Sequence, residues 1–364
     1  MDRPVTTNPK PRRDATLKDV ASLAGVSTAT IARVLHGRGY VALETRRLVE
    51  AAIAQSGYRV NEVAQGLRKQ RTFVLGHILQ SIAPNPFFAS VALSAQQEAA
   101  HFGCGVTVFN TQGDAEAERN AVERFLRQRV EAILFTTVTD DENVRLAAAA
   151  GVPVVQVERV GLTPTHAVSV DNYAGSFEAT AHLIALGHRS IAFIGVDPDR
   201  PVIGEPQPAL TGVTRRSEIE RERLAGYLEA LAAAELPVRA DLIDLGHTYY
   251  SPARGREVTR RFLAMKPAAQ PTAIFAACDL LAAGVLQEIH AQSLRAPDHL
   301  SVVGFDDTYA SHLAPALTTV AQPMEEIGRT AVQLALGGGA DQVRHERLTT
   351  RLVVRMSTGP PRSA

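Results

Sequence analysis

The chain has 364 residues, which is enough for two or three domains of roughly 100 to 150 residues each. It contains 45% hydrophobic and 21% charged residues, the proportions of a globular protein, and these exclude collagen-like, coiled-coil and wholly disordered chains. Cys104 and Cys278 are the only cysteines, so no disulfide framework holds the fold, and we expect both thiols to be buried.

The charge is distributed unevenly although its total is zero. Residues 1–72 carry 13 basic and 6 acidic side chains, a balance of +7, which leaves 25 basic and 32 acidic side chains, a balance of −7, for residues 73–364. A basic head on an acidic body predicts a polyanion as the partner of the head. No apolar stretch opens the chain and no run of about 18 apolar residues occurs, so we expect no signal peptide, no membrane span and a cytoplasmic location.

The periodicity of apolar residues changes twice along the chain. Residues 1–15 hold three prolines and four basic side chains with almost nothing to bury, which predicts a disordered basic arm. From Thr16 to about Gly57 apolar residues recur at helical spacing. From Phe73 onward short β-branched runs alternate with amphipathic stretches of helix length, which is typical of βαβ units on parallel sheets. The predicted strands are 73–80, 106–110, 132–136, 152–157, 191–195, 242–245, 273–276 and 301–305, and the predicted helices lie near 88–101, 116–128, 173–187, 222–234, 252–265 and 279–292.

Eight strands are too many for one small doubly wound domain. The pattern therefore predicts a body of two similar α/β subdomains, each with a doubly wound parallel sheet, that share a cleft.

The most specific motif lies at the start of the ordered chain. Thr16 is placed to cap a first helix with Asp19 as its partner, Gly25 supplies the positive φ that ends the helix, and Ser27 is placed to cap a second helix. Two short helices joined by such a turn form a helix-turn-helix, whose second helix enters the major groove of DNA by its N-terminal end. The alternative is a small three-helix bundle that is basic by chance, but the turn glycine, both caps and the local charge favour DNA binding.

The residues around this motif resemble a known family. LKDVASLAGVSTATIARVL followed by TRRLVEAAIAQSGYRVNEVAQGL resembles the DNA-binding head of the LacI/GalR (lactose-repressor) family with matching spacing. The family usually has Ser where Ala32 and Ala42 stand and Asn where His36 stands, so phosphate contacts or a cap are lost here. The resemblance implies that Asn61 to Leu67 is a hinge helix that orders on the operator, with Leu67 as a wedge in the minor groove; the alternative is a plain solvated linker.

The helix-turn-helix geometry, together with the resemblance, implies which residues contact DNA. Thr28, Ala29 and Thr30 lie at the start of the second helix, and Arg33, one turn on, is placed for a guanine edge or a phosphate. The full expected set is Thr16, Leu17, Ser27, Thr28, Ala29, Thr30, Arg33, Tyr40, Thr45, Asn61, Ala64 and Leu67.

The body carries no motif of an enzyme. It has no phosphate-binding glycine loop, no GxSxG elbow, no HExxH and no Cys/His metal spacing, so we expect no catalysis, no cofactor and no metal. The body also resembles the periplasmic-binding-protein-like regulatory part of the same family. Its landmarks include Asn85-Pro-Phe-Phe88, Val170-Asp171-Asn172, Arg223-Leu-Ala-Gly-Tyr227, Ala277-Cys278-Asp279 and Val303-Gly-Phe-Asp-Asp307.

The resemblance places an effector between the two subdomains. Phe87 and Phe88 would line one wall of the cleft and Tyr250 the other, while Arg223 and Asp279 would pair with polar groups of the effector. A sugar suits these residues because it has an apolar ring face and several hydroxyls. The alternative is that Phe87 and Phe88 are core residues and that Arg223 and Glu220 form a surface helix pair.

Two departures from the family pattern concern the cleft. Glu158-Arg159 stands where the family usually has Asp and then Arg, so Glu158 is expected to reach differently into the cleft. The segment between Gly195 and Arg223 is longer than usual, polar and proline-rich, and it is placed to cover the cleft.

Together these features predict a cytoplasmic, homodimeric transcription factor, most simply a repressor. It would comprise a basic arm (1–15), a helix-turn-helix domain (16–60), a hinge helix with linker (61–72) and an effector-binding and dimerisation body (73–364). A two-fold protein reading a pseudo-palindromic operator doubles the DNA contacts of one head. A solute-binding protein would fit the body alone, but the basic head and the missing signal peptide disfavour it. A sugar-processing enzyme on the same scaffold is disfavoured because no catalytic motif is present.

Overall fold

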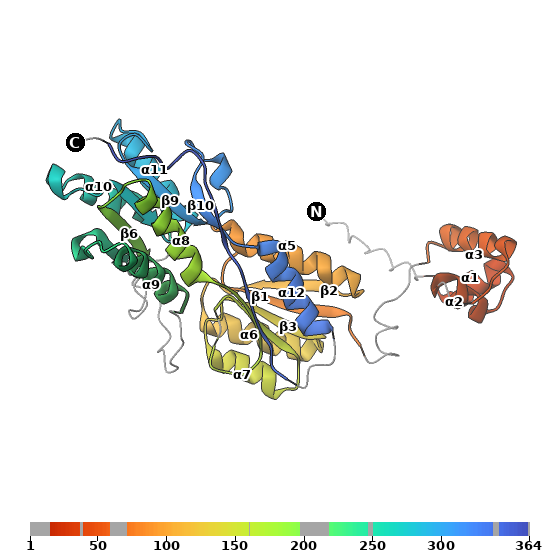
Figure 1. Ribbon diagram of the computed structural model, residues 1–364. Helices are drawn as coiled ribbons and strands as arrows, with labels where there is room; N and C mark the ends of the chain where they lie inside the picture. The colour runs from red at the N-terminus through yellow and green to blue at the C-terminus, as the bar shows by residue number, and fades with distance from the viewer. Residues whose placement is uncertain are drawn as a thin grey trace, which may run out of the picture. The chain divides into compact units, whose positions relative to one another are not determined.

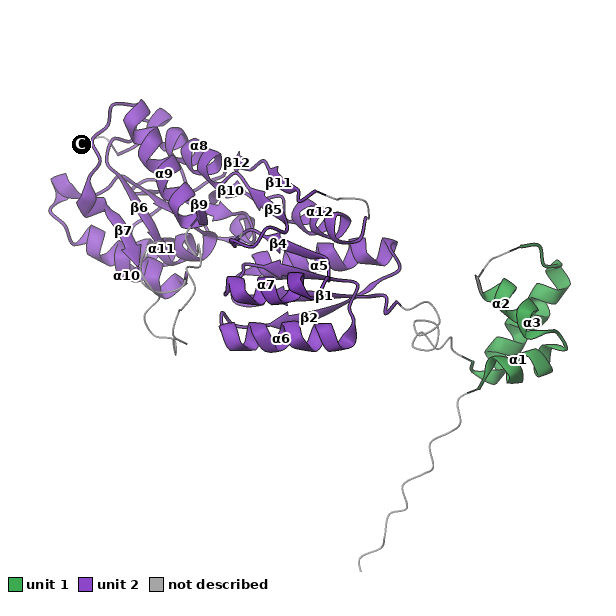
Figure 2. Ribbon diagram, turned by 90° about the horizontal axis from the view of Figure 1, so that it is seen from below, with its two compact units in different colours: residues 1–70 green, residues 71–364 purple. Residues whose placement is uncertain are grey.

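The computed structural model describes residues 15–36, 39–58, 71–159, 161–196, 218–246, 250–337 and 342–362. The chain divides into two compact units, residues 1–70 and 71–364, which are coloured green and purple in Figure 2. We call the first unit the head and the second the body.

Three helices form the head. They are α1 (Leu17–Ala24), α2 (Thr28–His36) and α3 (Leu43–Ser56). Val20, Ile31 and Val49, one from each helix, are fully buried against one another and form the centre of a small core. Because each helix contributes a single apolar stripe, its other faces remain available to solvent or to a partner.

The ends of the head's helices are set by the predicted caps. The backbone N–H of Asp19 donates to Oγ1 of Thr16 at 3.3 Å, and the N–H of Thr16 donates back to the Asp19 carboxylate at 2.7 Å. Gly25 ends α1 with a φ of 65°, and the N–H of Thr30 donates to Oγ of Ser27 at 3.2 Å. The predicted helix-turn-helix is therefore present with both caps. Ala42, at the start of α3, provides no side-chain cap.

Two six-stranded sheets form the centre of the body (Figure 1). The first has the order β11-β5-β4-β3-β1-β2 and is parallel throughout. The second has the order β12-β10-β9-β8-β6-β7 and is parallel except for β12, which pairs antiparallel with β10. The strands of the first sheet are β1 (Val74–Leu79), β2 (Gly105–Asn110), β3 (Ala132–Thr136), β4 (Val154–Val157), β5 (His166–Val170) and β11 (His345–Leu348). Those of the second are β6 (Ile191–Val196), β7 (Ile243–Gly246), β8 (Ala273–Ala276), β9 (Ser301–Asp306), β10 (Thr318–Ala321) and β12 (Arg351–Val353).

Helices cover both faces of each sheet. On the first sheet, α5 (Pro86–His101) and α12 (Met324–Leu336) pack side by side on one face, and α6 (Ala115–Gln128) and α7 (Asp141–Ala149) cover the other. On the second sheet, α8 (Asn172–Ala185) and α9 (Glu218–Ala233) share one face, and α10 (Pro252–Leu263) and α11 (Asp279–Ala291) share the other. Short 3-10 turns lie at Ala240–Leu242, Pro267–Ala269 and Ala310–His312. Because helices bury both faces of each sheet, the central strands have continuous apolar sequences.

The chain crosses between the two sheets three times. It leaves the first sheet after β5, returns after β10 by way of α12, and crosses again between β11 and β12. Each subdomain, meaning one sheet with its helices, is therefore built from separate pieces of the chain.

The eight predicted strands are present with ends that differ by at most two residues, and the six predicted helices are present as well. The prediction missed β5, β10, β11, β12, α7 and α12. The strands β11 and β12 are short, carry polar side chains and lie at sheet edges, so they lack the continuous apolar run of a central strand. In contrast, α12 has readable helical spacing at Ile327, Ala331 and Ala335, and its omission was an error of interpretation.

Cys104 and Cys278 are both buried free thiols, as predicted. Among the described residues, no helix combines the length and the apolar character that crossing a bilayer requires.

Candidate functional site

The N-terminal end of α2 carries the residues that the sequence predicts to contact DNA, and this end of the helix is exposed. Thr28, Ala29 and Arg33 are exposed, and none of them belongs to the core. Ser27 and Thr30 bond to each other through their hydroxyls at 3.0 Å, so both side chains also stabilise the start of the helix. Small side chains at this end would let the backbone approach a base edge closely.

The remaining predicted contacts of the head differ in their surroundings. Tyr40 is 92% exposed, an unusual position for an aromatic ring and one typical of an interface residue. Thr16 is exposed, whereas Leu17 and Thr45 are half-buried. The predicted contacts Asn61, Ala64 and Leu67 lie outside the described residues, as do residues 1–14 of the arm and residues 61–70 of the hinge segment.

In the body, polar side chains gather at the carboxyl ends of the strands, where ligands bind in open parallel α/β sheets. Glu158 directly follows β4 of the first sheet, whereas Cys278 follows β8 and Asp306 ends β9 of the second sheet. Tyr250 lies just before α10, and Arg223 projects from α9. We call the part of the subdomain junction that these residues occupy the cleft.

Direct contacts join the two subdomains across the cleft. Nδ2 of Asn85, the residue that caps α5, donates to Oδ2 of Asp306 at 3.3 Å. Nη2 of Arg159 lies 3.5 Å from Oε1 of Glu220 on α9. Because Asn85 and Arg159 belong to the first subdomain and their partners to the second, a change of the angle between the subdomains would disturb both contacts.

Arg223 lies at the centre of the cleft and is only 4% exposed. Its Nε donates to Oδ1 of Asn172 at 2.8 Å and its Nη1 donates to the carbonyl of Ala277 at 2.6 Å. Nη2 lies 3.8 Å from Oδ1 of Asp306, and the guanidinium stacks 3.8 Å from the ring centroid of Phe305. The alternative that Arg223 pairs with Glu220 on the helix surface is therefore wrong: Arg223 is buried and faces Asp306.

The carboxyl groups of the cleft are held away from water. Burial raises the pKa of Glu158 to about 7; the charge of Arg223 opposes this rise and that of Asp306 adds to it. Burial also raises the pKa of Asp306, again against the effect of Arg223. The pKa of Asp279 is raised by burial and by the charge of Asp306. Shifted pKa values of this kind are common where a protein binds a ligand.

Several buried polar atoms of the cleft have no hydrogen-bond partner within the described part of the chain. They are Oε1 of Glu158, the hydroxyl of Tyr250, Nε of Arg159 and Oε2 of Glu220. Buried polar groups are nearly always paired in folded proteins, so a set of unpaired ones that face one cleft indicates groups that a ligand would satisfy.

The two predicted aromatic residues of the first wall lie in different surroundings. Phe87 is buried in the core of the first subdomain, as the alternative interpretation held, whereas Phe88 is half-buried and packs against that core. Their rings meet edge to face with centroids 5.5 Å apart. Phe88 is thus the more accessible of the two.

Of the six predicted effector residues, the structure brings Glu158, Arg223 and Tyr250 together. Asp279 lies behind them: Oδ1 accepts from the hydroxyl of Thr319 at 2.6 Å and Oδ2 accepts from the N–H of Thr308 at 3.0 Å. The prediction missed Asp306 as a residue of the cleft. The predicted strand 301–305 ends directly before Asp306-Asp307, and this position at the carboxyl end of a strand could have indicated a site residue. It also missed the pair of Arg159 and Glu220, whose pairing no local pattern indicates.

Comparison with known proteins identifies the family. Residues 16–61 match the bacterial regulatory proteins of the lacI family, and residues 180–358 match a periplasmic binding protein-like domain. The HTH-type transcriptional repressor PurR of Haemophilus influenzae strain PittEE is 30% identical over 352 residues, which cover 94% of this chain and 98% of that protein. The chain belongs to the LacI family. The predicted family and its class of function, DNA-binding transcriptional regulation, are thereby confirmed.

Solved structures extend the likeness of this LacI-family chain to its whole fold. The lac repressor dimer bound to operator and the anti-inducer ONPF is 29% identical, with a TM-score of 0.77 over 95% of this chain and 100% of that chain. The complex of the transcriptional regulator CelR with cellobiose is also 29% identical, with a TM-score of 0.67 over 94% of this chain and 99% of that chain. The predicted fold class is confirmed.

Proposed function

We propose that this regulator is a repressor that binds a pseudo-palindromic operator as a homodimer, and that an uncharged, polyhydroxylated effector in the cleft, most simply a sugar, controls its affinity for DNA. The observation that carries the proposal is the group of buried and unpaired polar atoms on Glu158, Arg159, Glu220 and Tyr250. The relatives support it: the lac repressor is a dimer bound to operator, and CelR binds cellobiose.

The hydrogen-bonding capacity of the cleft favours hydroxyl groups. Glu220 offers an acceptor, Arg159 offers a donor, and the hydroxyl of Tyr250 is both. Glu158 accepts when it is charged and donates when it is protonated. A sugar hydroxyl donates and accepts, so one ligand of this class satisfies all four. An anion lacks the donor for Glu220. The guanidinium groups of Arg159 and Arg223 already face the carboxylates of Glu220 and Asp306, so a phosphate would have to compete with these carboxylates.

The head would read the operator through α2. We propose that Thr28, Ala29 and Arg33 face base edges and that Tyr40 and Thr45 lie at the DNA backbone, with Asn61, Ala64 and Leu67 as the hinge contacts. The domain boundaries predicted from the sequence, with an arm over 1–15 and a hinge over 61–72, belong to the same proposal. So do a cytoplasmic location and the absence of catalysis.

Two experiments with the full chain test this function. Selection from randomised duplexes should yield a pseudo-palindrome, and operator binding should then be measured by fluorescence anisotropy. A panel of neutral sugars and their phosphate esters is next screened by thermal shift, and each hit is added to the operator complex. We expect a neutral sugar to raise the melting temperature and to change operator affinity. Selection of a duplex without two-fold symmetry would contradict the dimeric repressor, and stabilisation by phosphate esters alone would contradict the effector class.

A further inference from the structure

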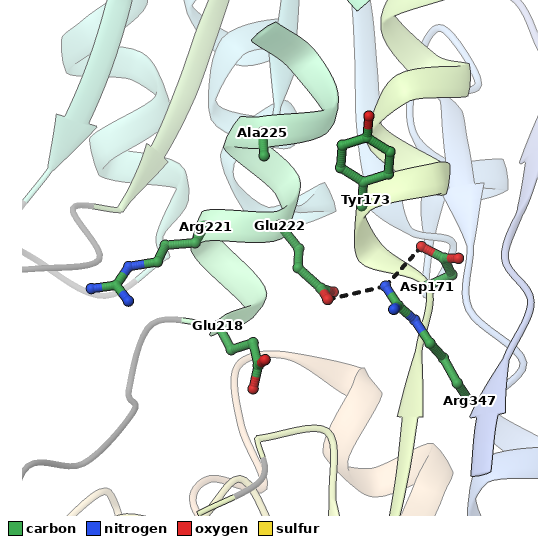
Figure 3. Close-up of a pocket in the computed structure, with 7 residues that line it drawn as sticks. All are labelled: Asp171, Tyr173, Glu218, Arg221, Glu222, Ala225 and Arg347. Carbon is green, nitrogen blue, oxygen red and sulfur yellow. Dashed lines mark hydrogen bonds and ion pairs between the residues drawn. The ribbon is translucent and has the colours of Figure 1, made fainter. Parts of the chain in front are cut away.

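A second junction between the subdomains lies outside the cleft, at Arg347. Arg347 lies on β11, the edge strand of the first sheet, and its Nη2 is 3.0 Å from Oδ1 of Asp171 and 3.0 Å from Oε1 of Glu222 (Figure 3). Glu222 belongs to α9, which packs on the second sheet. One guanidinium therefore connects an edge of the first subdomain to a helix of the second.

This junction is continuous with the cleft through two neighbouring residues. Glu222 precedes Arg223 on α9, so the same helical turn faces Arg347 on one side and the cleft on the other. Asn172 directly follows Asp171, and its Oδ1 accepts from Nε of Arg223 at 2.8 Å. A displacement of Glu222 would thus move the backbone of Arg223, and a displacement of Asp171 would move the group that orients its guanidinium.

We propose that Arg347 is a positioning residue that latches α9 to the first subdomain and so holds Arg223 beside Asp306 at the subdomain junction. An effect of Arg347 on effector affinity rests on the proposed function. Its effect on the distance between the subdomains does not.

The charges around Arg347 explain why the latch depends on this residue. The groove at the junction has a volume of about 550 Å³ and carries three carboxylates, Asp171, Glu218 and Glu222, beside Arg221 and Arg347. Asp171 follows β5 and caps α8, so it lies at the crossover between the subdomains, and the ion pair that spans them is that of Arg347 with Glu222. Without Arg347, this attraction between β11 and α9 would be lost, and Asp171 and Glu222 would remain as unneutralised like charges.

Arg347 is 46% exposed, so its ion pairs contribute little to the stability of the fold. The equilibrium between two subdomain arrangements involves a much smaller free-energy difference than folding does. A small contribution therefore changes the populations of the arrangements much more than it changes the fraction of folded protein. We therefore expect substitution of Arg347 to change the distribution of subdomain distances while the melting temperature remains nearly constant.

The test uses spin labels and requires neither operator nor effector. Asn120→Cys on α6 and Ala291→Cys on α11 place one label on each subdomain at exposed positions, while the native Cys104 and Cys278 are buried. The labelled full chain is diluted with unlabelled chain, and the distance distribution is measured by electron double resonance. We expect Arg347→Met to broaden the distribution or shift it to longer distances. High salt should do the same to the wild type and should add little to the variant, because it screens a half-exposed pair.

Arg145→Met is the matched control. Arg145 also contacts two carboxylates, Asp141 at 3.5 Å and Glu142 at 2.8 Å, but all three residues lie on α7 within one subdomain. Its substitution should leave the distribution unchanged. A distribution for Arg347→Met that coincides with that of the wild type would overturn the latch, whatever effector is found. Failure to find a sugar effector would instead count against the proposed function alone.

Discussion

Glu158 directly follows β4 of the first sheet and Asp306 ends β9 of the second, and both have a positive φ, 66° for Glu158 and 116° for Asp306. The charge of Asp306 raises the pKa of Glu158, so the two carboxyl groups interact across the cleft. Positive φ values are costly for residues with a side chain and persist where the surrounding structure imposes them. A positive φ thus occurs on each side of the cleft, at Glu158 in the first subdomain and at Asp306 in the second.

Glu158 should make the stability of the body depend on pH. Its pKa is raised from 4.5 to about 7 in the folded chain, so the folded state favours the protonated carboxyl. This contribution is fully present below pH 4.5 and is lost as the pH rises through about 7. We expect Glu158→Gln to reduce the fall in the unfolding free energy over that window, by an amount on the order of 1 to 3 kcal/mol.

Denaturant unfolding at several pH values measures this effect, with Glu229→Gln on the exposed face of α9 as the control. The control should follow the wild type at every pH. A pH profile of Glu158→Gln that runs parallel to that of the wild type would show that folding does not raise the pKa of Glu158.

Tyr250 offers a substitution that separates binding from stability. Its buried hydroxyl has no partner in the described residues, so Tyr250→Phe should leave the melting temperature unchanged or raise it slightly. If the hydroxyl bonds to the effector, the affinity for the effector should fall roughly 3- to 10-fold, as expected for the loss of about 1 kcal/mol. Calorimetry with the effector found by thermal shift measures the affinity.

Tyr227→Phe is the matched control for Tyr250→Phe. The hydroxyl of Tyr227 is fully buried and donates to the carbonyl of Ile191 at 2.9 Å. Its removal leaves that carbonyl unpaired and should lower the unfolding free energy by roughly 1 to 3 kcal/mol without a change in effector affinity. The opposite outcome, with Tyr250→Phe unstable and still tight in binding, would remove Tyr250 from the site.

Recognition by the head should be divided between two helices. Arg33 is exposed on α2, and Arg47 is exposed on α3. We expect Arg33→Ala to change which base is selected at one operator position, with a loss of roughly 1 to 3 kcal/mol in discrimination. Arg47→Ala should weaken binding to all duplexes alike and reduce the dependence of affinity on salt. Selection over randomised operators distinguishes the two, and a uniform loss for Arg33→Ala would argue against α2 as the recognition helix.

The uncapped start of α3 predicts a substitution that stabilises the head. Ala42 has an extended backbone and makes no side-chain cap, whereas Ser27 caps α2. Ala42→Ser should slow hydrogen exchange of the amides of α3 in the intact chain by about 1 kcal/mol of added stability. Ser27→Ala should accelerate exchange in α2 by a similar amount. Unchanged exchange in α3 would mean that water satisfies its first amides as well as serine does.

The strands and caps were predictable because each depends on neighbouring residues. A run such as Ala132–Thr136 must be buried on both faces, and Thr16 and Gly25 act within one turn of their own helix. The site was predictable only in part. Arg223 pairs with Asp306, 83 positions along the chain, and such a pairing depends on the relative placement of α9 and β9. The resemblance to a family gave Arg223, but only the fold shows that Asp279 is already bonded to Thr319.

The final pair of strands limits how the body can move. Leu348 ends β11 in the first sheet and Arg351 begins β12 in the second, so three Cα steps join the sheets. A trans chain of that length spans at most about 11 Å. We call this connection between Leu348 and Arg351 the strap. Near the strap the subdomains can rotate relative to each other but cannot separate, so the displacement of an atom during such a rotation must grow with its distance from the strap. Side chains far from β11 and β12 would therefore travel furthest on a given rotation, and the strap acts as the fulcrum of the body.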